Sequence, residues 1–164
     1  MPAGLIFRAF APTDQVGVHR LILEGLGDHF AEVDPTLNTD LDNIIASYID
    51  KGHCFVIAEI ERQIVAAGAL IDLGDGLGRL ARVSVARNHR HQGVGRAMVN
   101  HLVNLAREKH YRQVLVETNL DWHAAIALYQ RCGFAPYKRD DVSFHMSLNL
   151  TRAGQLLVDK LGQE

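Results

Sequence analysis

The feature that most restricts the fold is a basic loop set between a strand pattern and a long helix pattern. Leu, Arg and Val alternate with small residues from Leu80 to Val85, and an apolar stripe at helical spacing runs from Gly93 to Lys109. A second strand pattern, from Val114 to Thr118, follows this helix. The segment therefore predicts a strand–helix–strand crossover, which joins parallel strands.

The other patterns predict hairpins and further helices around this crossover. Strands are expected at Leu5–Phe10, Cys54–Ile60, Ile64–Leu73, Phe134–Lys138 and Val142–Leu148, and helices at Val16–Leu26, Leu41–Tyr48, His123–Arg131 and from Thr151 onward. The segment from Ala11 to Asp14 breaks the first strand and offers an N-cap for the first helix. This order favours an α/β (α+β) fold of three layers, with a mixed, mostly antiparallel sheet and helices on both faces. Without repeats or a linker, residues 1–164 are expected to form a single domain.

Composition excludes several classes of protein. Hydrophobic residues make up 48% and charged residues 22%, so the chain can bury a core. A net charge of -2 gives no general attraction to nucleic acid or anionic membranes, so neither partner is expected. Cys54 and Cys132 are too few for a disulfide framework. No signal peptide or run of roughly 20 apolar residues is found, so a cytoplasmic location is expected.

The loop from Arg87 to Arg96 has the properties of an anion site. The first N–H groups of the following helix have no partner inside that helix, and its N-terminus carries roughly half a positive charge. Gly93 and Gly95 let a phosphate approach the backbone, and Arg90 and Arg96 add cations. Neither a P-loop nor a dinucleotide fingerprint matches. A diphosphate-binding turn is predicted, with a solvated connection as the alternative.

These residues also carry a family resemblance. Arg90-x-x-Gly93-x-Gly95 resembles the Q/R-x-x-G-x-G/A motif of the GCN5-related N-acetyltransferases (GNAT). The segment Ala125 to Tyr129, followed by Gly133-Phe134, is similar to the A-I-x-L-Y and G-F elements of that family. The resemblance implies an enzyme, an acetyl-CoA (coenzyme A) dependent N-acetyltransferase that acts on a primary amine of a small molecule or amino-acid-like substrate. Alternatives are a protein acetyltransferase for lysines or chain N-termini, and a non-catalytic acyl-CoA sensor.

The resemblance assigns cofactor-binding residues. The strand end would pair with the pantetheine arm, the turn would hold the pyrophosphate, and Asn119 is included although it is out of register with the family's asparagine. The tyrosine of the second motif would contact the thioester and protonate the leaving thiolate. These residues are Val83, Ser84, Val85, Arg90, His91, Gln92, Gly93, Val94, Gly95, Arg96, Asn119 and Tyr129.

The general base and the acceptor site are expected elsewhere. Glu117 is the first choice as base, because a carboxylate in a partly apolar cleft can accept a proton through water. His123 and Asp121 are alternatives, and a neutral amine would need no base. The resemblance implies that the acceptor enters at the acidic segment after the first helix, with Asp28, His29 and Phe30, where carboxylates would attract a cationic amine.

Two further expectations concern metals and assembly. His89-x-His91 lacks a third ligand at a recognisable spacing, so no metal site is predicted. Strands near the C-terminus leave a sheet edge that would favour a homodimer.

Overall fold

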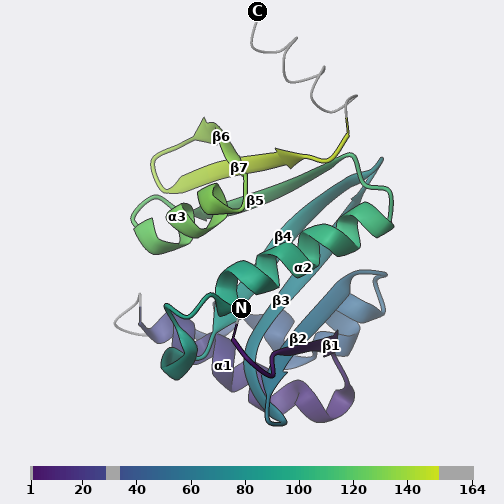
Figure 1. Cartoon of the computed structure of the whole chain (residues 1–164), viewed down its shortest axis with the longest axis vertical. Coiled ribbons are helices and arrows are strands. Elements are labelled where there is room, and N and C mark those ends of the chain that lie inside the picture. Colours follow the sequence, from purple (N-terminus) through teal and green to yellow (C-terminus); the bar gives the residue numbers. More distant parts are fainter. Residues whose placement is uncertain (1, 29–33, 152–164) are drawn as a thin grey trace, which may run out of the picture. The chain divides into compact units, whose positions relative to one another are not determined.

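The computed structural model describes residues 2–28 and 34–151. Within these residues a seven-stranded sheet has the order β1-β2-β3-β4-β5-β7-β6 (Figure 1). The strands are β1 Ile6–Ala9, β2 Cys54–Ile60, β3 Gln63–Gly74, β4 Leu77–Val85, β5 Gln113–Asn119, β6 Ala135–Arg139 and β7 Ser143–Asn149. The α-helices are α1 Gln15–Gly27, α2 Val94–Glu108 and α3 His123–Arg131. The predicted mixed sheet with helices is confirmed.

The chain divides into two compact units. Unit 1 comprises residues 1–69 and 82–98, and unit 2 comprises residues 70–81 and 99–164. Strands β3 and β4 and helix α2 each contribute residues to both units.

Unit 1 begins with an antiparallel β1–β2 pair in which Ile6 lies opposite Glu59. Phe55 of β2 packs edge-to-face on Phe10 and on Tyr48, with ring centroids 5.6 Å and 5.1 Å apart. Asp14 is the N-cap residue of α1, within the segment predicted to cap it, but its side chain makes no cap bond to this helix. That carboxylate is buried and instead accepts bonds from Arg8 and from the backbone N–H of residue 11.

The helix predicted at Leu41–Tyr48 is not regular. A 3-10 turn covers Thr39–Asp42 and a π-turn covers Ile45–Ile49. The side chain of Gln15 fills the break, since its amide donates to the carbonyl of Leu41 at 2.6 Å and accepts from the N–H of Ile44 at 3.0 Å. A partner from α1 therefore replaces the missing helical bonds.

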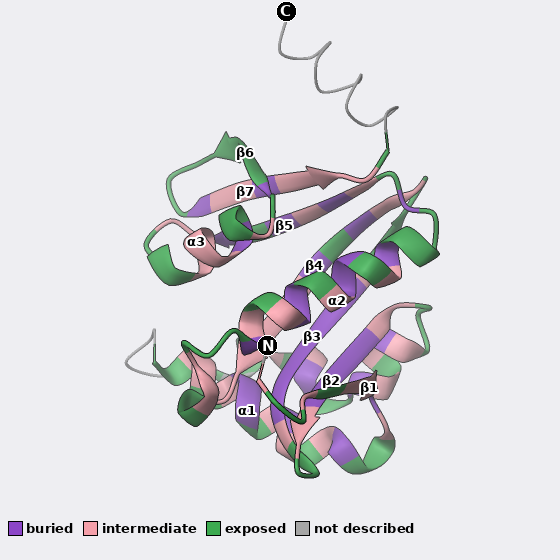
Figure 2. Cartoon of the chain, viewed as in Figure 1, coloured by how far each residue is buried: buried purple, intermediate pink, exposed green. Residues whose placement is uncertain are grey.

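In unit 2, two strands pair in parallel, as the predicted crossover requires. β4 and β5 are parallel, with Leu77 opposite Gln113 and Leu80 opposite Val116. β5–β7 and β6–β7 are antiparallel. Buried residues of this unit include Val114, Val116, Tyr129, Phe134 and Met146, whereas β6 is exposed along its length (Figure 2). The terminal helix predicted after Thr151 lies outside the described residues.

Candidate functional site

The predicted anion site lies in unit 1, at the start of α2. A 3-10 turn at Arg87–His89 is followed by His91 and Gly93, which have positive φ angles of 60° and 85°. The first helical hydrogen bond runs from the N–H of Ala97 to the carbonyl of Gly93 at 3.0 Å. The N–H groups of residues 94 to 96 precede that bond, so they remain as donors for an anion.

The space beside Gly93 is open. A Cβ atom built at this position would have no neighbouring atom within 4 Å. Val94, by contrast, is buried and anchors the first helical turn in the core. An anion can therefore reach the backbone at a fixed position, which is what a diphosphate cradle requires.

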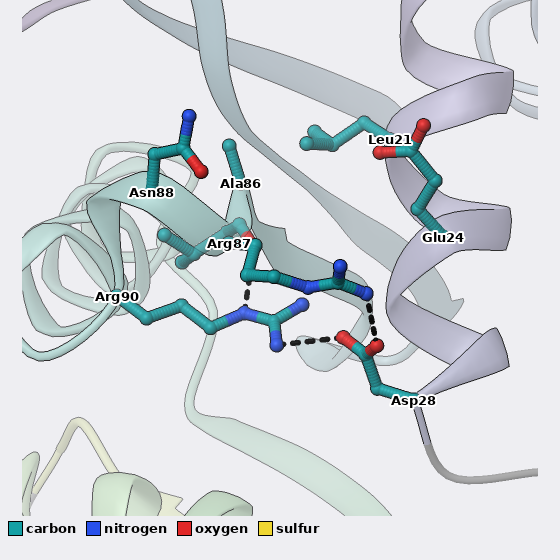
Figure 3. A pocket seen from close by; sticks show the side chains of 8 residues that line it. Leu21, Glu24, Asp28, Ala86, Arg87, Asn88 and Arg90 are labelled. Carbon is teal, nitrogen blue, oxygen red and sulfur yellow. Dashed lines mark hydrogen bonds and ion pairs between the residues drawn. The ribbon is translucent and has the colours of Figure 1, made fainter.

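A pocket of about 200 Å³ adjoins this turn. Figure 3 shows its lining, in which two arginines converge on one carboxylate. Arg87 and Arg90 both bind Asp28, the latter at 2.7 Å. The hydrogen bond from Arg90 has the larger effect in lowering the pKa of Asp28, and the hydrogen bond from Arg87 lowers it further. Arg90 also donates through Nε to the carbonyl of Val85 at 3.1 Å, which ties the turn to the end of β4.

The other turn and acceptor residues take several positions. His91, Gln92 and Arg96 are exposed, and the amide of Gln92 donates to the carbonyl of Asn88 at 3.1 Å. Asp28 is exposed as well, but its charge is matched by arginines rather than left for a cationic acceptor. His29 and Phe30 lie outside the described residues.

The strand segment expected to meet the pantetheine arm lies beyond the last β4–β5 pair. The register between these strands ends at Leu80 opposite Val116, while β4 continues to Val85. Arg82 has a positive φ of 56° at this point. Its guanidinium binds both carboxylate oxygens of Asp40, at 2.7 and 3.1 Å, which fixes the backbone just before residues 83 to 85.

The predicted acid lies in unit 2. Tyr129 on α3 is buried and packs edge-to-face on Phe134, with ring centroids 5.7 Å apart. Burial, with a smaller effect of Cys132, raises the pKa of this phenol. The hydroxyl therefore stays protonated at neutral pH and can act as a donor.

The predicted base lies on the other face of the same strands. A Cβ atom built at Gly133, just after α3, would lie 3.4 Å from Cδ1 of Leu148. Leu148 pairs with Val114, so the end of α3 lies on the sheet face that carries these two side chains. Because side chains alternate along a strand, the face of β5 that carries Val114 also carries Thr118. Glu117 points to the opposite face. Glu117 is 50% exposed and lies opposite His145 of β7. The expected apolar cleft does not surround it.

The remaining candidates lie close to the start of α3. Asn119 ends β5, and its carbonyl accepts from the N–H of Trp122 at 3.1 Å. Asp121 and His123 are exposed. Sequence reasoning missed Arg82, Tyr137 and His145, whose partners come from strand pairing and turns that no local motif indicates.

Comparisons with known proteins identify the family. The model of the acetyltransferase (GNAT) family matches residues 19–134, and the chain belongs to this family. The chain is similar to N-acetyltransferase 8 of Homo sapiens, with 35% identity over 108 residues, which are 62% of this chain and 48% of the human protein. It therefore spans about half the length of that relative.

Solved structures agree on the fold. The chain is similar to a GNAT-family acetyltransferase from Staphylococcus aureus Mu50, with a TM-score of 0.80 and 20% identity over 90% of this chain and 99% of that one. It is also similar to the PaiA N-acetyltransferase from Thermoplasma acidophilum in complex with coenzyme A, with a TM-score of 0.77 and 13% identity over 88% and 98% of the two chains. These likenesses establish the fold.

The described residues contain neither a helix suited to cross a membrane nor a cluster of metal ligands. In residues 2–28 and 34–151, no helix combines the length and apolar character that a bilayer crossing requires. The same residues contain no group of three or more His, Cys, Asp and Glu side chains placed to hold a metal ion.

Proposed function

We propose that this protein transfers the acetyl group of acetyl-CoA to a primary amine of a small molecule or amino-acid-like substrate. The observation that carries the proposal is the turn before α2, where donor N–H groups of residues 94 to 96 meet open space beside Gly93. Membership of the GNAT family and the coenzyme A complex of the PaiA relative support the same conclusion.

The diphosphate and the pantetheine arm of coenzyme A are both assigned to residues of unit 1. The N–H groups from Gln92 to Arg96 bind the diphosphate, and the helix N-terminus adds favourable electrostatics. The backbone of β4 from Val83 to Val85 extends past the β4–β5 register, so its polar groups suit an extended pantetheine arm. Arg90 holds this strand end to the turn through the carbonyl of Val85.

Bound acetyl-CoA would supply a thioester carbonyl for the amine to attack and a thiolate to leave. Tyr129 donates a hydrogen bond to the sulfur as negative charge develops. Its pKa lies above the ordinary value of about 10, and a thiol has a pKa of about 8.5, so full proton transfer is uphill and donation is the main contribution. Glu117 points to the opposite face of β5, so it accepts the proton that the amine releases through water.

The acceptor is assigned to the pocket beside α1. Glu24 lines this pocket and supplies a carboxylate for an ammonium group, whereas Asp28 is already paired with two arginines. His29 and Phe30 complete the proposed acceptor residues.

We extend the proposal to assembly and location. Residues 1–164 act as one catalytic domain. The exposed strand β6 lies at the end of the strand order and would pair with a second copy. Cys54 and Cys132 form no disulfide, which is compatible with the reducing cytoplasm.

An acceptor screen tests the function. Purified protein is mixed with acetyl-CoA and a panel of small amines, amino acids and peptides, and free thiol is measured. Amine-dependent thiol release with small amines is expected. Release with peptides alone would move the acceptor class to proteins, and tight coenzyme A binding without turnover would identify a sensor instead of an enzyme.

A further inference from the structure

A histidine lies between two carboxylates on the face of unit 2 that carries Glu117. Nδ1 of His145 lies 4.0 Å from Oε2 of Glu117, and Nε2 lies 3.4 Å from Oδ2 of Asp140. The His145 side chain is only 15% exposed, although both carboxylates are about half exposed. We call Glu117, Tyr137, Asp140 and His145 the His145 cluster.

The surrounding backbone holds Asp140 of the His145 cluster in place. Oδ1 of Asp140 accepts from the N–H groups of Val142 and Ser143, at 2.9 and 2.8 Å, so Oδ2 is left to face the imidazole. These backbone bonds are the main reason that the pKa of Asp140 is lowered. Burial opposes this effect, and the contact with His145 adds to it. The carboxylate is therefore ionised at neutral pH.

A β-bulge brings an aromatic ring to the same imidazole. The β6–β7 register shifts between Pro136 and Lys138, and the extra residue, Tyr137, has its ring 6.0 Å from that of His145. Partial burial is the larger cause that raises the pKa of Tyr137, and the charge of Glu117 is the smaller one. This phenol therefore stays neutral. In the β6–β7 pair, Lys138 lies directly opposite His145 and places a cation on the neighbouring strand. Bulges often re-aim side chains beside active sites.

We infer that His145 is a positioning residue and proton acceptor for Glu117, an inference that rests on the proposed acetyltransferase function. Asp140 accepts the Nε2–H of the neutral imidazole, and this bond leaves Nδ1 unprotonated toward Glu117. The tautomer is therefore set for accepting a proton from the Glu117 side.

The proton moves in three steps. The N–H bond of the ammonium or attacking amine breaks, and an O–H bond forms on Glu117. That O–H bond then breaks as Nδ1 of His145 takes the proton through one bridging water, because the separation of 4.0 Å is too long for a direct hydrogen bond. The imidazolium, flanked by Asp140, releases the proton to solvent and Glu117 is ready for the next turnover.

The tautomer is measured without turnover. Proton–nitrogen NMR of the histidine rings, assigned with the His145→Gln variant, reports which ring nitrogen carries hydrogen at alkaline pH. The Nε2–H form is expected in the wild type, and Asp140→Asn should weaken that preference. A predominantly Nδ1–H ring in the wild type would overturn the inference.

Kinetics then test the role in catalysis. With an amine from the acceptor screen, His145→Gln should lower kcat roughly tenfold or more and alter the acidic limb of the pH profile. Adding the same change to Glu117→Gln should cost nothing further, because residues that act as one unit are non-additive. Coenzyme A affinity should stay within about twofold, since His145 is not assigned to the cofactor.

A matched control separates this role from general effects. His19→Gln removes a histidine that faces Asp42 at 3.6 Å in unit 1, and it should leave kcat unchanged. His145→Asn serves as a second variant, with thermal unfolding measured for each. Wild-type kcat in His145→Gln, or full additivity with Glu117→Gln, refutes the inference alone. A wild type that releases no thiol with any amine refutes the acetyltransferase proposal, and the relay with it.

Discussion

Replacing Gly93 by alanine separates a conformational effect from a loss of cofactor binding, because Gly52 provides a matched control. Gly93 and Gly52 have φ angles of 85° and 84°, and a Cβ built at either position meets nothing within 4 Å. Both alanine variants should therefore carry the same left-handed strain, about 1–2 kcal/mol of unfolding free energy. Only the Gly93 position lies at the turn assigned to the diphosphate.

The expected loss of affinity follows from the donors at the start of α2. A methyl group at Gly93 would occupy space that a phosphate oxygen needs in order to reach the N–H groups of residues 94 to 96. Losing one charge-assisted hydrogen bond costs about 1.5–3 kcal/mol, which corresponds to a roughly 10- to 150-fold weaker Kd for coenzyme A. Gly52→Ala should bind coenzyme A like the wild type.

The assay pairs calorimetric titration of coenzyme A with urea unfolding of the wild type and both variants. Similar losses of stability in Gly93→Ala and Gly52→Ala would show that the strain is matched. If Gly93→Ala then bound coenzyme A within about twofold of Gly52→Ala, the assignment of the turn to the diphosphate would be wrong.

Three further changes have defined outcomes. Tyr129→Phe should lower kcat by about 100-fold and leave the coenzyme A Kd within about twofold, measured by thiol release and titration; an unchanged kcat would make the tyrosine structural. Gly78→Ala should lower the unfolding free energy by about 1–3 kcal/mol in urea, because its Cβ would lie 2.7 and 2.9 Å from ring atoms of Tyr111; wild-type stability would show that the ring moves aside freely. Asp14→Asn should cost about 1–3 kcal/mol at neutral pH. The Arg8 bond lowers the pKa of Asp14, so this contribution is present above about pH 4, the unfolded value, and is lost as pH falls through the lower folded value. A stability difference between wild type and Asp14→Asn that stayed constant down to pH values well below 4 would contradict this ion pair.

Elements with strong local signals could be predicted from the sequence. The predicted bounds of β2, Cys54–Ile60, and of α3, His123–Arg131, match the structure at both ends. Each has an unbroken apolar period and a turn signal next to it, so no distant contact needs to be known. The turn before α2 belongs to the same class, because its glycines and the following helix lie within a few residues.

Features that depend on distant partners could not be predicted. The helix expected at Leu41–Tyr48 is broken by the side chain of Gln15, which lies 26 and 29 residues from its two partners. The environment of Glu117 depends on the β5–β7 register and on a bulge in β6. Alternating patterns predict strands, but they do not state which residues become cross-strand neighbours.

The positions of Arg90 and Asp28 change the electrostatic interpretation of the turn. Sequence reasoning counted Arg90 as a free cation for phosphate, yet its guanidinium is already matched by Asp28, while Nε bonds the carbonyl of Val85. The attraction for a diphosphate must then come mainly from the N–H groups of α2 and from the exposed Arg96.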